Sequence, residues 1–217
     1  MAAILLDLDG TLTDPGIGVE RCLRHALATL GCEPPHIDLA RAVGPPLREV
    51  LGEWMAGAAE ASVDEAIRLY RKRYAERGLY ENAVYPGVVE LLEGIRARGW
   101  RSYVVTSKLE VIAVRVLAHF GLAAYLAGVC GSRSGELGRK QDLVARVLRR
   151  ESIAPDAAVV VGDRHHDVSG ARACGLDAIG VTYGYGTREE LERAGAAWIC
   201  DDPPSVLSVL DGLLGTN

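Results

Sequence analysis

The stretch AILLDLDGTLTDPG (residues 3–16) begins with apolar residues and then places two carboxylates two positions apart, at Asp7 and Asp9. A short, nearly continuous apolar run is typical of a strand buried on both faces, as in a parallel sheet. Gly10 and the Asp-Pro-Gly sequence at 14–16 then interrupt the strand pattern. The stretch therefore predicts a buried strand that ends at a pair of acids, an arrangement that packing alone does not require.

Short apolar or β-branched runs recur along the chain, with amphipathic segments of helix length between them. Strands that alternate with helices form a parallel sheet that is covered by helices. We therefore expect an α/β fold with a doubly wound, Rossmann-like parallel sheet. The predicted strands are 3–8, 103–105, 126–129, 157–161, 178–181 and, more weakly, 197–200.

The gap between the first two predicted strands is several times longer than the later crossovers. Its first part, 16–79, has helical periodicity and no convincing strand pattern. We therefore predict an α/β core formed by residues 1–15 and 80–217, and a small α-helical domain formed by residues 16–79.

The composition is that of an ordinary globular protein, with 24% charged residues and a net charge of −5. This balance gives no sign of a nucleic-acid partner. The five cysteines are scattered and form no CxxC pair, which argues against a disulfide framework or a zinc site. With no apolar run of membrane-helix length, we expect a cytoplasmic protein without a membrane partner, either a monomer or a weak homodimer.

Polar residues gather where the predicted strands end, which is where open parallel sheets bind ligands. Carboxylates suit Mg²⁺, which usually keeps several waters and takes one or two protein carboxylates plus phosphate oxygens. The set predicts phosphoryl transfer, with Asp7 as nucleophile and Asp9, its pKa raised by burial, as the carrier of a proton. The residues at these positions are Asp7, Asp9, Thr106, Ser107, Gly162, Asp163 and Asp167, and Lys140 begins the helix after the third strand.

Four segments, DLDGTLTD, VVTSK, GRKQDLV with Lys140, and VGDRHHD, resemble in order the four motifs of the haloacid dehalogenase superfamily of phosphatases. The resemblance covers essentially the whole chain, and the helical segment after the first motif resembles the type 1 cap. VGPPL and VYPGV are similar to turns of phosphoglycolate phosphatases. DLDGTLTDPGIG, VGDRHHD and YGYGTREEL are closer to the 5′-nucleotidase-like subgroup, although YGYG by itself indicates only a loop.

The resemblance implies that Asp7 attacks phosphorus to form an aspartyl phosphate. Asp9 would protonate the leaving oxygen and then activate the hydrolytic water. It also implies a Mg²⁺ ion held by Asp7, Asp163 and the carbonyl of Asp9, with Asp167 orienting these ligands. The phosphoryl group would be held by Thr106, Lys140 and the backbone amides of Gly10 and Ser107.

Several alternatives stay open on the sequence. Lys108 or Arg139 could replace Lys140 in the phosphate contact, because the third motif departs from the usual pattern. The substrate would be a small phosphorylated metabolite, phosphoglycolate or a nucleoside 5′-monophosphate, and Gly44 and Arg48 of the helical domain are candidates for choosing it. A phosphomutase of the β-phosphoglucomutase kind and a receiver-like phospho-switch are the competing functions.

Overall fold

The computed structural model describes residues 2–33, 36–133 and 138–215. The chain divides into two compact units, one formed by residues 1–13 and 84–217 and the other by residues 14–83. The inserted unit thus begins and ends within a few residues of the limits 16–79 expected from the sequence. Within the described residues, no helix combines the length and the apolar character needed to cross a bilayer.

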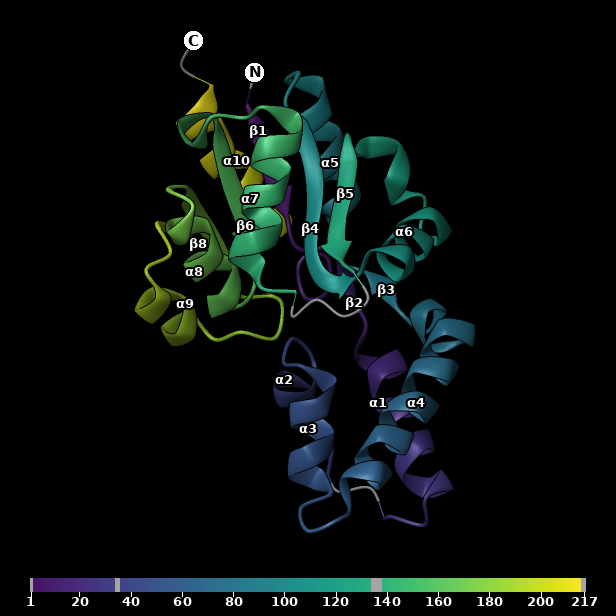
Figure 1. Cartoon of the computed structure of the whole chain (residues 1–217). Helices are drawn as coiled ribbons and strands as arrows, with labels where there is room; N and C mark the ends of the chain where they lie inside the picture. The colour runs from purple at the N-terminus through teal and green to yellow at the C-terminus, as the bar shows by residue number, and fades with distance from the viewer. Residues whose placement is uncertain (1, 34–35, 134–137, 216–217) are drawn as a thin grey trace. The chain divides into compact units, whose positions relative to one another are not determined.

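The larger unit is built on a six-stranded sheet with the order β5-β4-β1-β6-β7-β8 (Figure 1). Every pairing in it is parallel, and the central strand β1 pairs through Ala3 with Arg101 on one side and Ala158 on the other. This confirms the predicted α/β parallel-sheet fold. The strands are β1 (Ala3–Leu6), β4 (Arg101–Leu109), β5 (Gly128–Ser132), β6 (Ala158–Gly162), β7 (Asp177–Val181) and β8 (Trp198–Cys200).

Helices cover both faces of this sheet, because its strands are apolar on both sides. One core cluster joins Ala3 and Leu5 of β1 to apolar residues of α7, α8 and α9, while α5 and α10 pack together behind the sheet in Figure 1. The α-helices of the unit are α5 (Val88–Ala97), α6 (Glu110–His119), α7 (Lys140–Glu151), α8 (His165–Ala173), α9 (Arg188–Ala194) and α10 (Pro203–Leu214), with short 3₁₀ turns at Leu122–Tyr125 and Pro155–Ala157.

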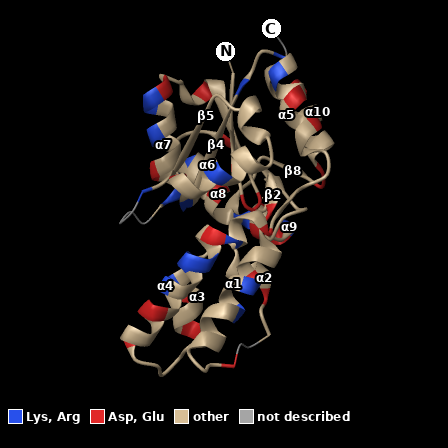
Figure 2. Ribbon diagram, turned by 90° about the vertical axis from the view of Figure 1, so that its right-hand side faces the viewer, with Lys and Arg blue, Asp and Glu red and all other residues tan. Residues whose placement is uncertain are grey.

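The inserted unit contains α1 (Gly16–Thr29), α2 (Leu39–Ala42), α3 (Leu47–Trp54), α4 (Glu60–Glu76) and a 3₁₀ turn at Gly78–Tyr80. Helices α1 and α4 pack side by side through their buried apolar faces. Figure 2 shows residues of both charges along α4, where Arg68 pairs with Glu65. The chain leaves the core at β2 (Thr13–Asp14) and returns at β3 (Ala83–Val84), and these two short strands form a two-stranded sheet.

Candidate active site

The acidic segment after β1 lies at the carboxyl end of the central strand. The Asp7 amide donates to the Val161 carbonyl at 2.9 Å, so the pairing of β1 with β6 continues up to this residue. The chain then turns sharply at Gly10, whose φ is +87°. A Cβ at this position would lie 2.7 Å from Oδ1 of Asp163, so only glycine fits here. The turn therefore brings the first motif and Asp163 into direct contact.

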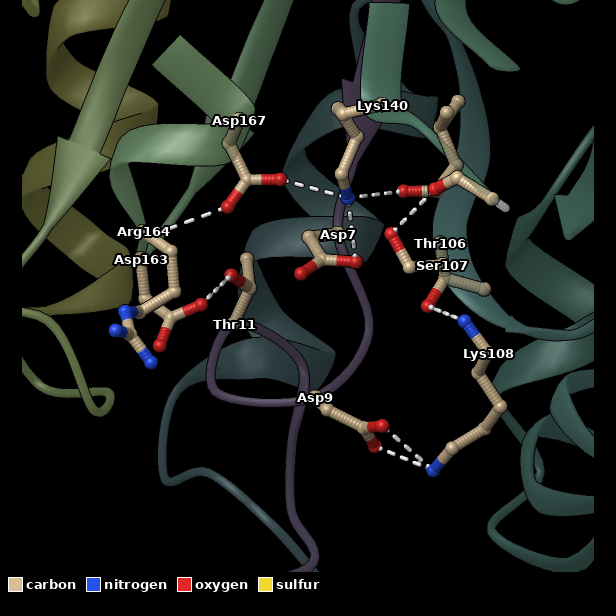
Figure 3. A network of polar contacts seen from close by, with 12 residues as sticks. Asp7, Asp9, Thr11, Thr106, Ser107, Lys108, Lys140, Asp163, Arg164 and Asp167 are labelled. Atoms are coloured by element: carbon tan, nitrogen blue, oxygen red, sulfur yellow. Dashed lines mark hydrogen bonds and ion pairs between the residues drawn. The ribbon is translucent and has the colours of Figure 1, made fainter. Parts of the chain in front are cut away.

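Lys140 is the cation at the centre of the site (Figure 3). Its side chain is 5% exposed, and its Nζ lies 2.8 Å from Oδ1 of Asp7, 2.6 Å from Oδ1 of Asp167 and 2.8 Å from the Val105 carbonyl. Burial alone would lower the pKa of Lys140, but the Asp167 and Asp7 carboxylates outweigh burial and raise it. The ammonium group therefore stays charged between the carboxylates of Asp7 and Asp167.

Three carboxylates, those of Asp7, Asp163 and Asp167, each offer an oxygen within 4.8 Å of the others. Burial raises the pKa of Asp163 well above its usual range, and the Asp167 and Asp7 charges raise it further. The partners described for its carboxylate are uncharged: the Thr11 hydroxyl at 3.5 Å and the Tyr185 amide at 2.8 Å. A buried carboxylate with neutral partners needs a countercharge. The all-oxygen donor set therefore fits a hard divalent cation.

Asp167 connects this cluster to α8. Besides its contact with Lys140, it accepts a hydrogen bond from the Arg164 amide at 3.1 Å, at the start of the helix. Burial raises the pKa of Asp167 to about 6, with Lys140 opposing this shift. Asp167 thus lies next to the Asp7–Lys140 pair, and its role in orienting cation ligands stays a prediction.

Asp9 lies apart from Asp7 in Figure 3 and pairs with Lys108, whose Nζ is 2.6 Å from Oδ2. Burial raises the pKa of Asp9, and Lys108 opposes the rise. The direction is the one that the sequence interpretation required for a proton donor. Of the three cations left open for the phosphate contact, Lys140 is the one beside Asp7, Lys108 contacts Asp9, and Arg139 immediately precedes α7.

Thr106 is the last residue of the buried part of β4, and Ser107 and Lys108 follow it. Thr106 is 2% exposed and its hydroxyl accepts from the Lys108 amide at 3.2 Å, while the Ser107 hydroxyl donates to the Gly138 carbonyl at 2.9 Å. The expectation for Gly10 requires correction. Its amide donates to the Thr13 carbonyl at 2.8 Å, so the turn itself occupies the group that was expected to face the phosphoryl oxygens.

The specificity candidates Gly44 and Arg48 belong to the inserted unit. Gly44 has a φ of +106° in the turn before α3. Arg48 is exposed and forms ion pairs with Asp64 and Glu60 of α4. These contacts account for both residues structurally, and a role in substrate choice stays a prediction.

Sequence reasoning missed three contributors to the site, Thr11, Tyr183 and Tyr185. Tyr183 donates through its hydroxyl to the Thr11 carbonyl at 3.0 Å, and Tyr185 supplies the amide that faces Asp163. Both tyrosines lie in the YGYG segment after β7, which by itself indicated only a loop and contributed to the resemblance to the 5′-nucleotidase-like subgroup. Two glycines beside aromatic residues at the end of a strand were the available signal.

Comparison with known proteins identifies the family. Residues 4–181 match the model of the haloacid dehalogenase-like hydrolases. A 5′-nucleotidase of Pseudomonas aeruginosa is 40% identical over 96% of this chain and 95% of its own length. A phosphoglycolate phosphatase of Agrobacterium fabrum is 30% identical over 83% of this chain and 80% of its own length. A crystal structure of a predicted phosphatase from Clostridium acetobutylicum superposes with a TM-score of 0.89 at 35% identity, covering 98% of this chain and 99% of that one.

One relative carries a different name. The tyrosine-protein kinase PtkA of Mycobacterium tuberculosis is 41% identical over 88% of this chain, which spans 65% of the length of that protein. The family match covers most of the chain, and the motifs, the fold and the phosphatase relatives agree with it. The chain therefore belongs to the haloacid dehalogenase-like hydrolase family, and within it to the phosphatases.

Proposed function

We propose that the protein is a Mg²⁺-dependent phosphomonoester hydrolase that works through an aspartyl phosphate on Asp7. The observation that carries this proposal is that Asp7 and Asp9 lie in two different environments within the site. Asp7 pairs with the charged Lys140 next to the carboxylates of Asp163 and Asp167, and Asp9 lies apart with a raised pKa. One carboxylate is thus prepared to attack and the other to carry a proton.

In the first step, a carboxylate oxygen of Asp7 forms a bond to phosphorus while the bond from phosphorus to the ester oxygen breaks. Asp9, in its protonated form, gives its proton to the leaving oxygen, and an alcohol departs. In the second step Asp9, now ionised, accepts a proton from water as the water oxygen attacks phosphorus. The bond between Asp7 and phosphorus breaks, so inorganic phosphate leaves and both carboxyl groups return to their initial state.

The remaining groups lower the barrier by holding charge in place. Lys140 and Thr106 would hold phosphoryl oxygens, together with the backbone amide of Ser107. Asp7, Asp163 and the Asp9 carbonyl would hold Mg²⁺, with Asp167 orienting them. When bound, this ion would neutralise charge on the phosphoryl group. The fit rests on the buried, all-carboxylate cluster with its 4.8 Å spread.

For the substrate we propose a small phosphorylated metabolite, with a nucleoside 5′-monophosphate ahead of phosphoglycolate. The relative named 5′-nucleotidase is more similar in sequence than the relative named phosphoglycolate phosphatase, at 40% against 30% identity. The similarity to PtkA makes tyrosine phosphorylation an alternative that needs its own assay. A phosphomutase and a phospho-switch remain alternatives because they share the same acidic chemistry.

The test is a set of phosphate-release assays with and without Mg²⁺. The substrates are nucleoside 5′-monophosphates, phosphoglycolate, a hexose phosphate and phosphotyrosine, and a separate reaction contains ATP and a tyrosine-containing peptide. Asp7→Asn removes the nucleophilic oxygen with little change in shape. Asp177→Asn is the matched control, because Asp177 is exposed at the first residue of β7, at the opposite end of the strands.

We expect Mg²⁺-dependent phosphate release by the wild type and by Asp177→Asn, and a loss of at least about 1,000-fold in Asp7→Asn. A base-labile phosphoryl group should label the wild type. With p-nitrophenyl phosphate, whose leaving group needs no proton, label should accumulate in Asp9→Asn, because this variant can be phosphorylated but cannot activate water. An isomerised hexose phosphate would favour the mutase, and lasting label without turnover would favour the switch. Full activity of Asp7→Asn would refute the mechanism.

A further inference from the structure

The loop after β7, residues 182–186, lies against the acidic cluster. Its Tyr183 hydroxyl donates to the carbonyl of Thr11 at 3.0 Å, which joins two segments that are 172 residues apart in the sequence. The ring of Tyr183 also contacts that of Tyr85 edge to face, with centroids 5.1 Å apart. Burial raises the pKa of Tyr183, so its hydroxyl stays protonated and remains a donor. Tyr183 is therefore fixed at both its ring and its hydroxyl.

The two glycines of this loop let its backbone approach Asp163 closely. A Cβ on Gly184 would lie 2.6 Å from Oδ2 of Asp163 and would also collide with the Gly10 carbonyl. A Cβ on Gly186 would collide with the Asp163 carbonyl. Contact this close is a reason for glycine at both positions. The loop thus packs directly on the aspartate.

Each oxygen of the Asp163 carboxylate contacts one of the two segments that Tyr183 connects. Oδ1 lies 3.5 Å from the Thr11 hydroxyl, and Thr11 is the residue whose carbonyl accepts from Tyr183. Oδ2 accepts from the amide of Tyr185, two residues after Tyr183, at 2.8 Å. Asp163 is fully buried, so its orientation depends on these contacts.

We propose that Tyr183 is a positioning residue for Asp163, and that its hydrogen bond to Thr11 fixes the carboxylate in the orientation that binds the divalent cation. The proposal rests on the proposed function only in taking Asp163 as a cation ligand. Groups that orient a metal ligand typically change metal affinity or activity by about 10–100-fold when they are removed. Tyr183 touches no reacting atom in this scheme and acts through Thr11 and Asp163.

The test compares Tyr183→Phe with Tyr103→Phe. Each variant loses one phenolic hydrogen bond and keeps its ring, and the Tyr103 hydroxyl instead contacts Glu151 at 3.1 Å, at the end of α7 away from Lys140. Binding of Mn²⁺ to each protein is measured without substrate, by the loss of the free-ion electron paramagnetic resonance signal. Thermal unfolding of the same samples without cation reports the general cost of each change.

We expect Tyr183→Phe to bind Mn²⁺ about tenfold more weakly than the wild type and Tyr103→Phe to bind normally. In turnover assays, saturating Mg²⁺ should restore kcat of Tyr183→Phe, with KM for the phosphate ester unchanged. Gly184→Ala, which pushes on Asp163 itself, should lose Mn²⁺ binding.

Equal Mn²⁺ affinity in Tyr183→Phe and the wild type would overturn the positioning role while leaving the hydrolase proposal standing. An equal loss in Tyr183→Phe and Tyr103→Phe would also overturn it, because the effect would then be one of general stability. A wild type that binds no Mn²⁺ would contradict both proposals. If Mn²⁺ binding follows the expected order but no ester is hydrolysed, the proposed function alone fails.

Discussion

The charged residues at the centre of the site do not balance, because there are three carboxylates and one lysine. The carboxylates of Asp7, Asp163 and Asp167 lie close together, and Lys140 contacts two of them. The Lys140 side chain is 5% exposed, and Asp163 and Asp167 are at most 1% exposed, so water screens these charges little. A buried pair of this kind contributes little when complete and costs a great deal when one partner is removed.

Lys140→Met should therefore lower the free energy of unfolding by about 3–5 kcal/mol at pH 8, because two buried carboxylates lose their shared cation. Without the cation, the folded state binds protons more readily than the unfolded state, so the loss should shrink as the pH falls from 8 to 5. Urea unfolding of the wild type and the variant at both pH values measures this loss of stability. Lys72→Met, at an exposed position of α4, should change stability by less than about 0.5 kcal/mol. A loss independent of pH would contradict the charge explanation.

At this scale the sequence predicted which acids and which lysine would meet, because the ends of parallel strands converge on one edge of the sheet. It could not predict that the Gly10 amide turns back to Thr13, since that depends on the path of one tight turn. It placed Lys140 in the site but left Lys108 and Arg139 open as alternatives, because the choice depends on the three-dimensional position of α7. The sequence also could not predict the contact of Tyr183, because its partner Thr11 lies 172 residues earlier in the chain.

At the scale of elements, a side chain of α9 holds the start of α8. Glu190 of α9 accepts from the His165 amide at 2.9 Å and from the Arg164 side chain at 3.0 Å, and it lies 2.7 Å from the His165 ring nitrogen. A carboxylate next to the first amides of a helix is favourable. Glu190 thereby fastens α9 to the helix that carries Asp167.

Glu190→Gln should lower the free energy of unfolding by about 1–2 kcal/mol at pH 7. Burial alone would raise the pKa of Glu190, but hydrogen bonds from His165 and Arg164 outweigh it and lower the pKa to about 2. The stability from this carboxylate is thus complete above its unfolded value of 4.5 and is lost as the pH falls toward about 2. In urea unfolding, the difference from wild type should narrow between pH 7 and pH 3. Glu192→Gln, on the same helix and exposed, is the control.

The edge strand β5 shows a second element-scale device. Side chains cover backbone groups on its open side: Arg146 donates to the Gly131 carbonyl at 3.4 Å, Arg150 donates to the Val129 carbonyl at 3.3 Å, and Glu110 accepts from the Gly131 amide at 3.0 Å. An edge with free backbone groups is a template for pairing with another chain. The two arginines therefore protect this edge.

Replacing both Arg146 and Arg150 by alanine should promote self-association with little change in stability, about 1 kcal/mol or less. Sedimentation velocity at increasing protein concentration measures the association. Arg149→Ala, an exposed position on the same helix, should sediment as the wild type does. A double variant that sediments like the wild type would show that β5 is protected by other means.

The sequence predicted the type of most elements more reliably than the residues at which they begin and end. The apolar runs predicted all six strands of the large sheet, β8 more weakly than the others, because strands buried on both faces are rich in apolar residues. Their limits shifted, as in the strand predicted at 126–129 and found at Gly128–Ser132. Strands β2 and β3 were not predicted, since two residues are too few to show periodicity.

For the molecule as a whole, the buried acidic cluster lowers the stability of the core. A bound cation would offset this loss. A ligand that binds only the folded state stabilises it by about 2.7 kcal/mol at a concentration of 100 times its Kd. Burial raises the pKa of Asp163, so the ionised carboxylate is unfavourable in the cation-free fold. Folding of the core and binding of a divalent ion would therefore be thermodynamically linked.

Thermal unfolding should show this linkage. Saturating Mg²⁺ should raise the Tm of the wild type by roughly 5–10 °C, and NaCl at equal ionic strength should not. Asp163→Asn should lose the Mg²⁺ response, and without Mg²⁺ at pH 8 it should be about 1 kcal/mol more stable than the wild type, as often happens when a functional site is neutralised. A destabilised Asp163→Asn with an intact Mg²⁺ response would contradict this account.

The central position of β1 has a consequence for how the chain matures on the ribosome. Its Ala3 pairs with Arg101 and with Ala158, so the first strand made must wait for two others that are synthesised much later. At roughly 5–20 residues per second, that wait is on the order of ten seconds. The helical unit, contiguous from Asp14 to Ala83, is synthesised completely within this interval. Synthesis from the N-terminus thus completes the inserted unit before the sheet that it interrupts, and leaves the apolar strand β1 unpaired in the meantime.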